Sequence, residues 1–259
     1  MIQFVLIIIA LLATLIGATT GIGGGIVIKT LYDVIGVHSI LEIGFYTTVV
    51  VFTMCIISII KQYRNGFKYD LPVLLFISFG SMAGGYLGDW LLNLFASDIS
   101  RSSLQLGQSI ILLMTLLFLI YYNYRVDENS MRFSRSVLNM LILGLFLGSI
   151  SIFLGIGGGP LNVSLLVIFF GYSMKQAAIY SIATVFFSQI TKILSIILSQ
   201  QYIQFDLSIV PWLILVGLVG GYFGTRANQQ ISNEGITKIY SIFMMGMCIL
   251  TVFNIVRVL

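Results

Sequence analysis

Long apolar runs separated by short polar segments dominate the chain. An α-helix of about 20 residues crosses a hydrocarbon core of about 30 Å, so each run of about 18 or more apolar residues is a candidate transmembrane helix. This pattern predicts an all-α polytopic membrane protein with about eight full spans. The predicted spans are residues 2–19, 40–60, 71–94, 103–123, 134–153, 174–199, 207–228 and 236–257.

Two glycine runs interrupt this pattern, because residues 21–25 and 155–159 both read GIGGG. Each run is followed by a shorter apolar segment, at residues 26–35 and 160–171. A single helix over residues 3–35 would be about 50 Å long, which exceeds the thickness of the hydrocarbon core. We therefore expect each glycine run to break the chain and to start a short helix.

Three landmarks recur in the same order along the chain. The second GIGGG follows the first by 134 residues, and the other two landmarks recur at spacings of 134 and 136 residues. They are Tyr46-Thr47 with Tyr180-Ser181, and GGYLG at 84–88 with GGYFG at 220–224. The sequence therefore predicts two homologous transmembrane repeats in one integrated membrane domain, residues 1–124 and 133–259, joined by the charged loop RVDENSMRFSR.

The charges in the loops predict how the chain is threaded. If each glycine run reverses the chain, nine Lys and Arg residues lie on one side of the membrane and two on the other. If the chain instead continues across, the division is seven against four. Basic residues concentrate on the cytoplasmic side of membrane proteins, which favours the reversal. Each repeat then crosses the membrane an odd number of times, so the two repeats are predicted to be inverted.

The composition agrees with a multi-pass protein of the cell membrane, in contact with membrane lipid. The chain is 58% hydrophobic and 8% charged, whereas a soluble domain has about 25% charged residues. The net charge of +4 comes mostly from loop residues that set orientation, and no soluble face is left to collect them for nucleic-acid binding.

The glycine runs are candidates for an anion site. The segments after them are expected to be helical, and Pro160 fits a first helical position. A helix start presents unsatisfied N–H groups and the positive end of the helix dipole, which together hold anions without a charged side chain. The alternative is that these glycines only let helices pack closely. The candidate binding residues here are Gly23, Gly24, Gly25, Gly157, Gly158, Gly159 and Asn162.

Hydroxyl groups follow a helical spacing in the span that begins at residue 174. Residues 181, 184, 188, 191 and 195 are all Ser or Thr, which places five hydroxyls on one helical face. Such hydroxyls can donate to an anion, or they can bond backbone carbonyls one turn back and join helices. The candidate binding hydroxyls are those of Ser181, Thr184 and Ser188, with Thr47 from the first repeat.

Two lysines lie within or beside the predicted spans. Lys29 follows the first glycine run, and Lys192 lies one turn after Ser188. A lysine inside a membrane is costly, which suggests that it supplies positive charge to a site. The alternative is that its long side chain extends to the membrane surface.

The motifs GIGGGIVIK and GIGGGPLN, with YT/YS and GGYLG/GGYFG, resemble the sulfite exporter TauE/SafE (TSUP) family over the whole chain. The resemblance implies a secondary carrier for small sulfur-containing anions, such as sulfite, thiosulfate or an organosulfonate, or for carboxylates. We expect the anion to lie between the two glycine runs near the middle of the membrane, and one repeat to rock against the other for alternating access.

Other classes of function fit the sequence less well. A passive anion channel on the same scaffold is the main alternative. An enzyme or a metal site would need clustered His, Cys or carboxylate residues, and the chain has one His, so no enzyme activity, metal or cofactor is predicted. His38 and Glu42 are interpreted as interfacial residues, and participation of either one in proton coupling is the alternative. The sequence leaves open whether H⁺ or Na⁺ is coupled to transport and whether the chain forms a homo-oligomer.

Overall fold

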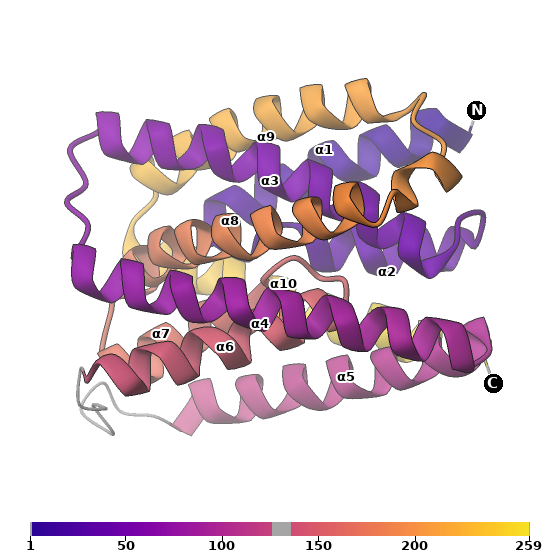
Figure 1. Cartoon of the computed structure of the whole chain (residues 1–259). Coiled ribbons are helices and arrows are strands. Elements are labelled where there is room, and N and C mark those ends of the chain that lie inside the picture. The colour runs from indigo at the N-terminus through magenta and orange to yellow at the C-terminus, as the bar shows by residue number, and fades with distance from the viewer. Residues whose placement is uncertain (1, 126–135, 259) are drawn as a thin grey trace.

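A computed structural model describes residues 2–125 and 136–258 (Figure 1). Most of the predicted charged loop, with Arg132 and Arg135, lies outside these ranges. The described residues form ten α-helices and one 3-10 helix, η1. In chain order they are α1 (Ile2–Thr20), α2 (Gly25–Ile35), α3 (Ile40–Arg64), α4 (Leu71–Asp98), α5 (Arg101–Arg125), α6 (Val137–Phe153), α7 (Gly159–Phe170), α8 (Met174–Leu198), η1 (Gln201–Gln204), α9 (Val210–Gln230) and α10 (Asn233–Val258).

Seven of the described helices are long and apolar enough to cross a membrane. Each of these coincides with a span predicted from the sequence. The remaining predicted span, residues 134–153, is the 17-residue apolar helix α6, and its first two predicted residues lie outside those described. The short helices expected after the glycine runs are α2 and α7, and Pro160 lies in the first turn of α7 as predicted. The chain is therefore a multi-pass helical membrane protein.

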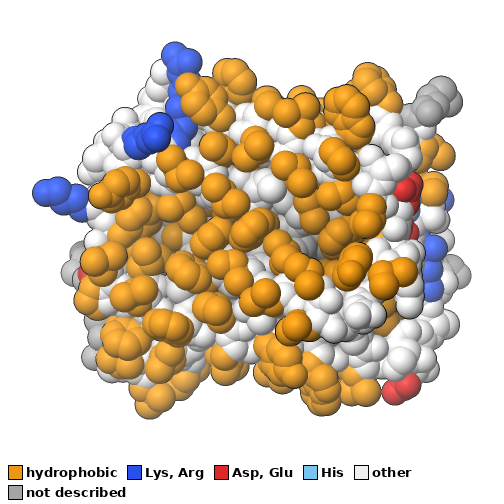
Figure 2. Space-filling model, turned by 45° about the horizontal axis from the view of Figure 1, so that its top comes forward, with side chains coloured by type: hydrophobic (Ala, Val, Ile, Leu, Met, Phe, Trp, Pro, Cys, Tyr) orange, Lys and Arg blue, Asp and Glu red, His pale blue; other side chains and the backbone are white. Residues whose placement is uncertain are grey.

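The outer surface agrees with lipid contact. Figure 2 shows hydrophobic side chains spread over a broad face, with charged side chains toward its two ends. Large apolar side chains such as Phe4, Phe79 and Ile249 are 61–71% exposed, which would be costly in water.

The chain turns back at the first glycine run. The Tyr32 hydroxyl in α2 donates to the Leu6 carbonyl in α1, and a Cβ atom added to Gly24 would lie 2.4 Å from the Ala13 carbonyl oxygen. Residue numbers therefore rise along α2 as they fall along α1, so the two helices are antiparallel.

The second glycine run also reverses the chain. Helix α7 is antiparallel to α8. Gly158, just before α7, contacts Val185, whereas the ring of Tyr172, just after α7, stacks on the ring of Tyr180, which comes earlier in α8. In addition, Gln229 contacts both Lys61 and Lys175. Its side-chain amide donates to the Lys61 backbone carbonyl, and its backbone carbonyl accepts from Lys175 Nζ. Both lysines lie at the same end of the bundle, as expected only if the glycine runs reverse the chain.

The fourth helix of each predicted repeat, counting the short helix, packs on the other predicted repeat. In α4, Gly84 lies against Leu145 of α6, and in α9, Gly220 lies against Thr14 of α1. A Cβ atom on Gly84 would lie 2.0 Å from the Leu145 carbonyl oxygen, so this close helix crossing requires glycine. Six of the described helices form two groups. We call α1, α3 and α9 the first bundle, and α4, α6 and α8 the second bundle. Each bundle contains helices from both predicted repeats.

The two bundles run in opposite directions. Within the first bundle, residues 217 and 221 of α9 face residues 50 and 54 of α3, so these helices are parallel. In the second bundle, α4 and α8 are also parallel, since Ser81 faces Thr184 and Asp89 faces Lys192. Because a short loop joins α3 to α4 as an antiparallel pair, α3 runs opposite to α8, its counterpart in the other repeat.

The two short helices lie in the interior. Ten of the 12 residues of α7 and seven of the 11 residues of α2 are buried. The irregular backbone that precedes each helix is therefore covered by protein, which is the condition under which such backbone is tolerated at membrane depth.

Candidate functional site

The two glycine runs meet inside the molecule. We call residues 21–25 the first elbow and residues 155–159 the second elbow. The Gly159 N–H donates to the Ile22 carbonyl at 2.9 Å, which is a direct backbone bond between the elbows. The sequence-based expectation that the two runs lie together is therefore confirmed.

The backbone of both elbows requires glycine. Gly24 and Gly158 immediately precede α2 and α7. Their φ values are 72° and 113°, in the positive region that residues with a Cβ atom rarely adopt. Space is also limiting, because a Cβ atom on Gly25 would lie 2.1 Å from the Ile156 carbonyl oxygen. The alternative that the glycines serve close packing thus describes part of their role, and the packing is between the elbows themselves.

The positive ends of two helices converge at the elbows. Helix α2 runs antiparallel to α1, and α7 runs antiparallel to α8, which lies in the oppositely directed bundle. The N-termini of α2 and α7 therefore meet, and the helices run away from each other. Their dipoles add positive potential at one point, although one of the N–H groups, that of Gly159, already donates to Ile22.

Unpartnered polar groups surround this point. The Thr47 hydroxyl, the Asn162 side-chain oxygen and both polar atoms of the Gln189 amide are buried and have no hydrogen-bond partner among the described residues. Thr47 and Gln189 lie beside the elbows. A Cβ atom on Gly25 would lie 3.0 Å from the Thr47 methyl group, and a Cβ atom on Gly157 would lie 3.3 Å from the side-chain nitrogen of Gln189. Thr47 and Asn162 were predicted from the sequence. Gln189 was not, although an amide in the middle of a predicted span is a signal that points to it.

The predicted hydroxyls on α8 are mostly used within the protein. The Ser181 hydroxyl donates to the Gly21 carbonyl at 2.7 Å and so ties α8 to the first elbow. Thr184 and Ser188 donate to carbonyls of their own helix. This is the alternative interpretation of the spacing, in which hydroxyls bond backbone carbonyls and join helices. In this structure their protons do not point to an open anion site.

Both predicted lysines are buried in ion pairs. Lys29 pairs with Asp33 one turn along α2, and Lys192 Nζ lies 2.9 Å from an oxygen of Asp89 in α4. The side chain of Lys192 is 3% exposed, so it does not extend to the membrane surface. Asp89 also accepts a hydrogen bond from the Ser195 hydroxyl. The sequence did not indicate this pair, because its members are 103 residues apart.

The stem of Lys29 lies close to the second elbow. A Cβ atom on Gly155 would be 3.4 Å from the Cδ and Cε atoms of Lys29. The stem of Lys29 therefore packs against the second elbow, while its ammonium group pairs with Asp33. Lys192 instead lies beside Gly44 of α3.

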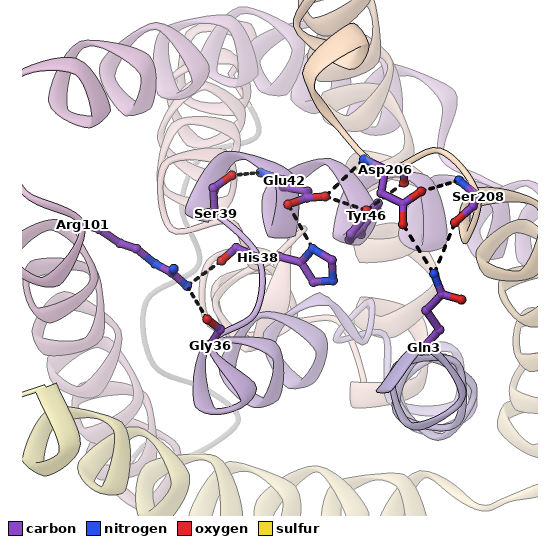
Figure 3. Close-up of polar contacts among 9 residues, drawn as sticks. All are labelled: Gln3, Gly36, His38, Ser39, Glu42, Tyr46, Arg101, Asp206 and Ser208. Carbon is purple, nitrogen blue, oxygen red and sulfur yellow. Dashed lines mark hydrogen bonds and ion pairs between the residues drawn. The ribbon is translucent and has the colours of Figure 1, made fainter. Parts of the chain in front are cut away.

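A polar cluster closes one end of the bundle (Figure 3). His38 Nδ1 lies 3.0 Å from Glu42, and the Tyr46 hydroxyl lies 2.8 Å from both Glu42 and the Asp206 carbonyl and donates to one of them. His38 and Glu42 are partly exposed, as expected for interfacial residues. The cluster ties α3 to the loop before α9, which keeps two helices of the first bundle in register.

Asp206 remains ionised in this cluster. Hydrogen bonds from the Ser208 hydroxyl and N–H hold the pKa of Asp206 below its usual value. A carboxyl whose pKa is lower in the folded state stabilises that state above its unfolded pKa. This contribution is lost as the pH falls through the lowered pKa, so acid weakens this end of the bundle.

Replacing Tyr46 with phenylalanine should destabilise this end. The change removes a hydrogen bond to a charged group or a backbone carbonyl at a fully buried ring, at a cost of about 1.5–3 kcal/mol. Thermal unfolding in detergent measures the effect, with Tyr63→Phe as the control because Tyr63 is 73% exposed. Equal unfolding temperatures for the two variants would contradict the role assigned to Tyr46.

Among residues 2–125 and 136–258, no group of three or more His, Cys, Asp or Glu side chains is arranged to hold a metal ion. The described polar groups near the elbows are instead backbone N–H groups, a hydroxyl, an amide and an ammonium group, all of which can donate hydrogen bonds to an anion.

Comparison with known proteins gives one result. No curated protein and no solved structure matches the chain. The family described as sulfite exporter TauE/SafE matches residues 6–251, a range that contains both elbows, both bundles and both buried ion pairs. The chain therefore belongs to the sulfite exporter TauE/SafE family, a family of membrane transporters.

Proposed function

We propose that the protein is a secondary transporter of small oxyanions and that the anion binds where the two elbows meet. The sulfur-containing anions sulfite, thiosulfate and organosulfonates are the first candidates, and small carboxylates are the second. The observation that carries this proposal is the convergence of the N-termini of α2 and α7 in the protein interior. Two positive helix ends repel each other, and an anion between them removes that repulsion.

The neighbouring side chains supply what an oxyanion needs. The Thr47 hydroxyl and the Gln189 amide have unused donors at this point. Buried donors without partners are costly, and a bound oxyanion would satisfy them. Lys29, whose stem lies along the second elbow, supplies the positive charge. Ser181, Thr184 and Ser188 hold α8 and the first elbow in place and donate to the anion only after a change of rotamer.

The arrangement of the bundles supports alternating access. Each bundle combines helices from both sequence repeats, and the elbows lie between the bundles. We propose that the first bundle moves against the second, so that the units that move differ from the halves of the sequence. Two inverted repeats would give outward-open and inward-open states of similar energy, since exchanging the conformations of the repeats converts one state into the other.

A passive channel is the competing proposal. It needs a continuous path of water past the elbows, whereas the backbones of the two elbows are in direct contact. This contact argues for a carrier.

The experiment is a transport assay with purified protein in liposomes. A carrier should exchange labelled sulfite or thiosulfate against unlabelled anion inside, with a rate that saturates with concentration. A flux that rises linearly without saturation would contradict the carrier and support the channel.

Ligand-dependent stabilisation identifies the anion class. Sulfite, thiosulfate, sulfate, taurine, sulfoacetate and small carboxylates are compared with chloride in thermal unfolding experiments. A true ligand at about 100 times its Kd should add about 2.7 kcal/mol to the unfolding free energy. If none of these anions raised the unfolding temperature above chloride, the proposed binding site would be wrong.

A further inference from the structure

A small polar cavity lies beside the proposed anion site. It has a volume of about 10 Å³, enough for about one water molecule. The residues that line it come from α2, α5, α10 and the turn before the second elbow: Lys29, Thr30, Asp33, Gln108, Ser109, Leu112, Leu154, Thr251 and Asn254.

Three oxygen atoms of the cavity residues lack a donor. They are Oδ1 of Asp33, Oε1 of Gln108 and Oδ1 of Asn254, and each is buried with no hydrogen-bond partner among the described residues. Exchanging the oxygen and nitrogen positions of either side-chain amide would not supply the missing donor, because each amide nitrogen already donates a hydrogen bond. Gln108 donates to the Phe153 carbonyl at 2.7 Å, and Asn254 donates to the Thr30 carbonyl at 3.1 Å. A water molecule in the cavity can donate to two of these three oxygens, which leaves a surplus of one acceptor.

Protonation of Asp33 would correct this surplus. A neutral carboxyl group carries an O–H donor, which can satisfy one of the amide oxygens in the same cavity. With Asp33 ionised, that donor is missing, and Lys29 is the carboxylate's only charged partner among residues 2–125 and 136–258. The cavity thus suits both forms of Asp33, the ionised form with Lys29 and the neutral form without it.

We propose that Asp33 binds the coupling proton, and that an anion at the elbows takes Lys29 from Asp33 while Asp33 takes up a proton from water. This inference rests on the proposed function. A buried carboxylate that lost its lysine would be an uncompensated charge next to a bound anion, which is strongly unfavourable. Charge is conserved in the exchange: the Lys29–Asp33 pair, the anion and one proton become a lysine–anion pair and a neutral acid. The lysine–anion pair is neutral for a monoanion and keeps one negative charge for a dianion such as thiosulfate.

Other titratable groups near α2 are already engaged. The neighbouring helix α1 has no titratable side chain, and Tyr32 donates to its Leu6 carbonyl. Just after α2, His38 pairs with Glu42 of α3, which also contacts Tyr46. Arg101 of α5 donates to the Gly36 and His38 carbonyls. The lining residues from α5 and α10 are uncharged. Asp33 and Lys29 are therefore the groups in this region that can exchange a proton for an anion.

The test measures proton uptake when purified protein binds thiosulfate, whose own charge is constant over the pH range of the assay. The wild-type protein should take up about one proton per anion, so its affinity should fall as the pH rises, by up to about tenfold per pH unit. Asp33→Asn, which is always neutral, should take up none and bind with an affinity independent of pH. Asp98→Asn is the control, because it removes a carboxylate that is exposed at the end of α4, and it should behave as the wild type does.

Two results separate this inference from the proposed function. If Asp33→Asn still takes up a proton and keeps the pH dependence, the inference is wrong and the anion site stands. If the wild-type protein binds none of the sulfur-containing anions or small carboxylates named above, the proposed function is wrong and the inference falls with it. Binding that depends on Na⁺ and involves no proton uptake would also overturn the inference.

An infrared measurement covers the case in which Asp33→Asn does not fold. Adding thiosulfate to the wild-type protein should produce the C=O band of a protonated carboxyl group. Asn254→Leu and Gln108→Leu, which remove acceptors for that proton, should shift the pH midpoint of anion binding to lower values. Absence of the band in a wild-type protein that binds the anion would overturn the inference.

Discussion

Alanine in place of Gly25 should abolish anion transport. Gly25 begins α2 with a helical backbone, so alanine costs little in backbone conformation. Its Cβ atom would however lie 2.1 Å from the Ile156 carbonyl oxygen and 3.0 Å from the Thr47 methyl group. The elbows must then separate by about 1 Å, a displacement that costs about 100-fold in rate when it misplaces binding groups in enzymes. Counterflow of thiosulfate in liposomes measures the loss.

Two matched controls distinguish this effect from a general effect of alanine. Gly107 in α5 and Gly246 in α10 are helical glycines with nothing within 4 Å of a Cβ atom. Gly107→Ala and Gly246→Ala should transport normally. The overpacking in Gly25→Ala costs about 1–3 kcal/mol, so the amount of folded protein is compared by gel filtration. Transport by folded Gly25→Ala at the wild-type rate would show that contact between the elbows is not needed.

Breaking the pair of Asp89 and Lys192 should strongly destabilise the protein. Asp89→Leu leaves the Lys192 ammonium buried without its carboxylate and removes the acceptor for Ser195, at a cost of about 3–5 kcal/mol. The double variant Asp89→Leu/Lys192→Met removes both charges and should recover most of the loss, because apolar residues often replace a buried ion pair without penalty. Unfolding in detergent measures both.

The same variants separate stability from transport. If the pair only holds α4 against α8, the double variant should be both stable and active. If it is stable but inactive, Lys192 or Asp89 takes part in anion binding or in movement between the bundles. A single Asp89→Leu variant as stable as the wild type would contradict the ion pair itself.

Local patterns in the sequence predicted the parts of the fold that depend on local physics. Apolar run length placed the spans, since the membrane sets the length of a helix. The glycine runs indicated broken helices, since positive φ values and close backbone contact need glycine. The spacing of the duplication and the loop charges indicated the reversal at each elbow. The span predicted at residues 134–153 begins outside the described residues, and within them α6 begins at Val137, directly after its N-cap Ser136.

Features that depend on distant partners were not accessible in the same way. The contact of Lys192 with Asp89 appears only once α4 and α8 are packed. The pair of Lys29 and Asp33 is local, at positions i and i+4 of α2, and the sequence-based prediction missed it even though such pairs face each other on a helix. Helical spacing showed that Ser181 and Thr184 share a face. It did not distinguish an anion from a carbonyl as the acceptor, because both accept the same proton.

The packing of α9 on α1 has a consequence for synthesis in the membrane. The Thr14 hydroxyl lies 3.3 Å from the Val216 carbonyl, and these residues are 202 positions apart. Helix α1 must therefore wait in lipid, with the surface that contacts Gly220 and Gly224 of α9 uncovered, until α9 has been translated. Contacts of such long separation form slowly, and a truncated chain that ends before residue 210 leaves α1 without its partner.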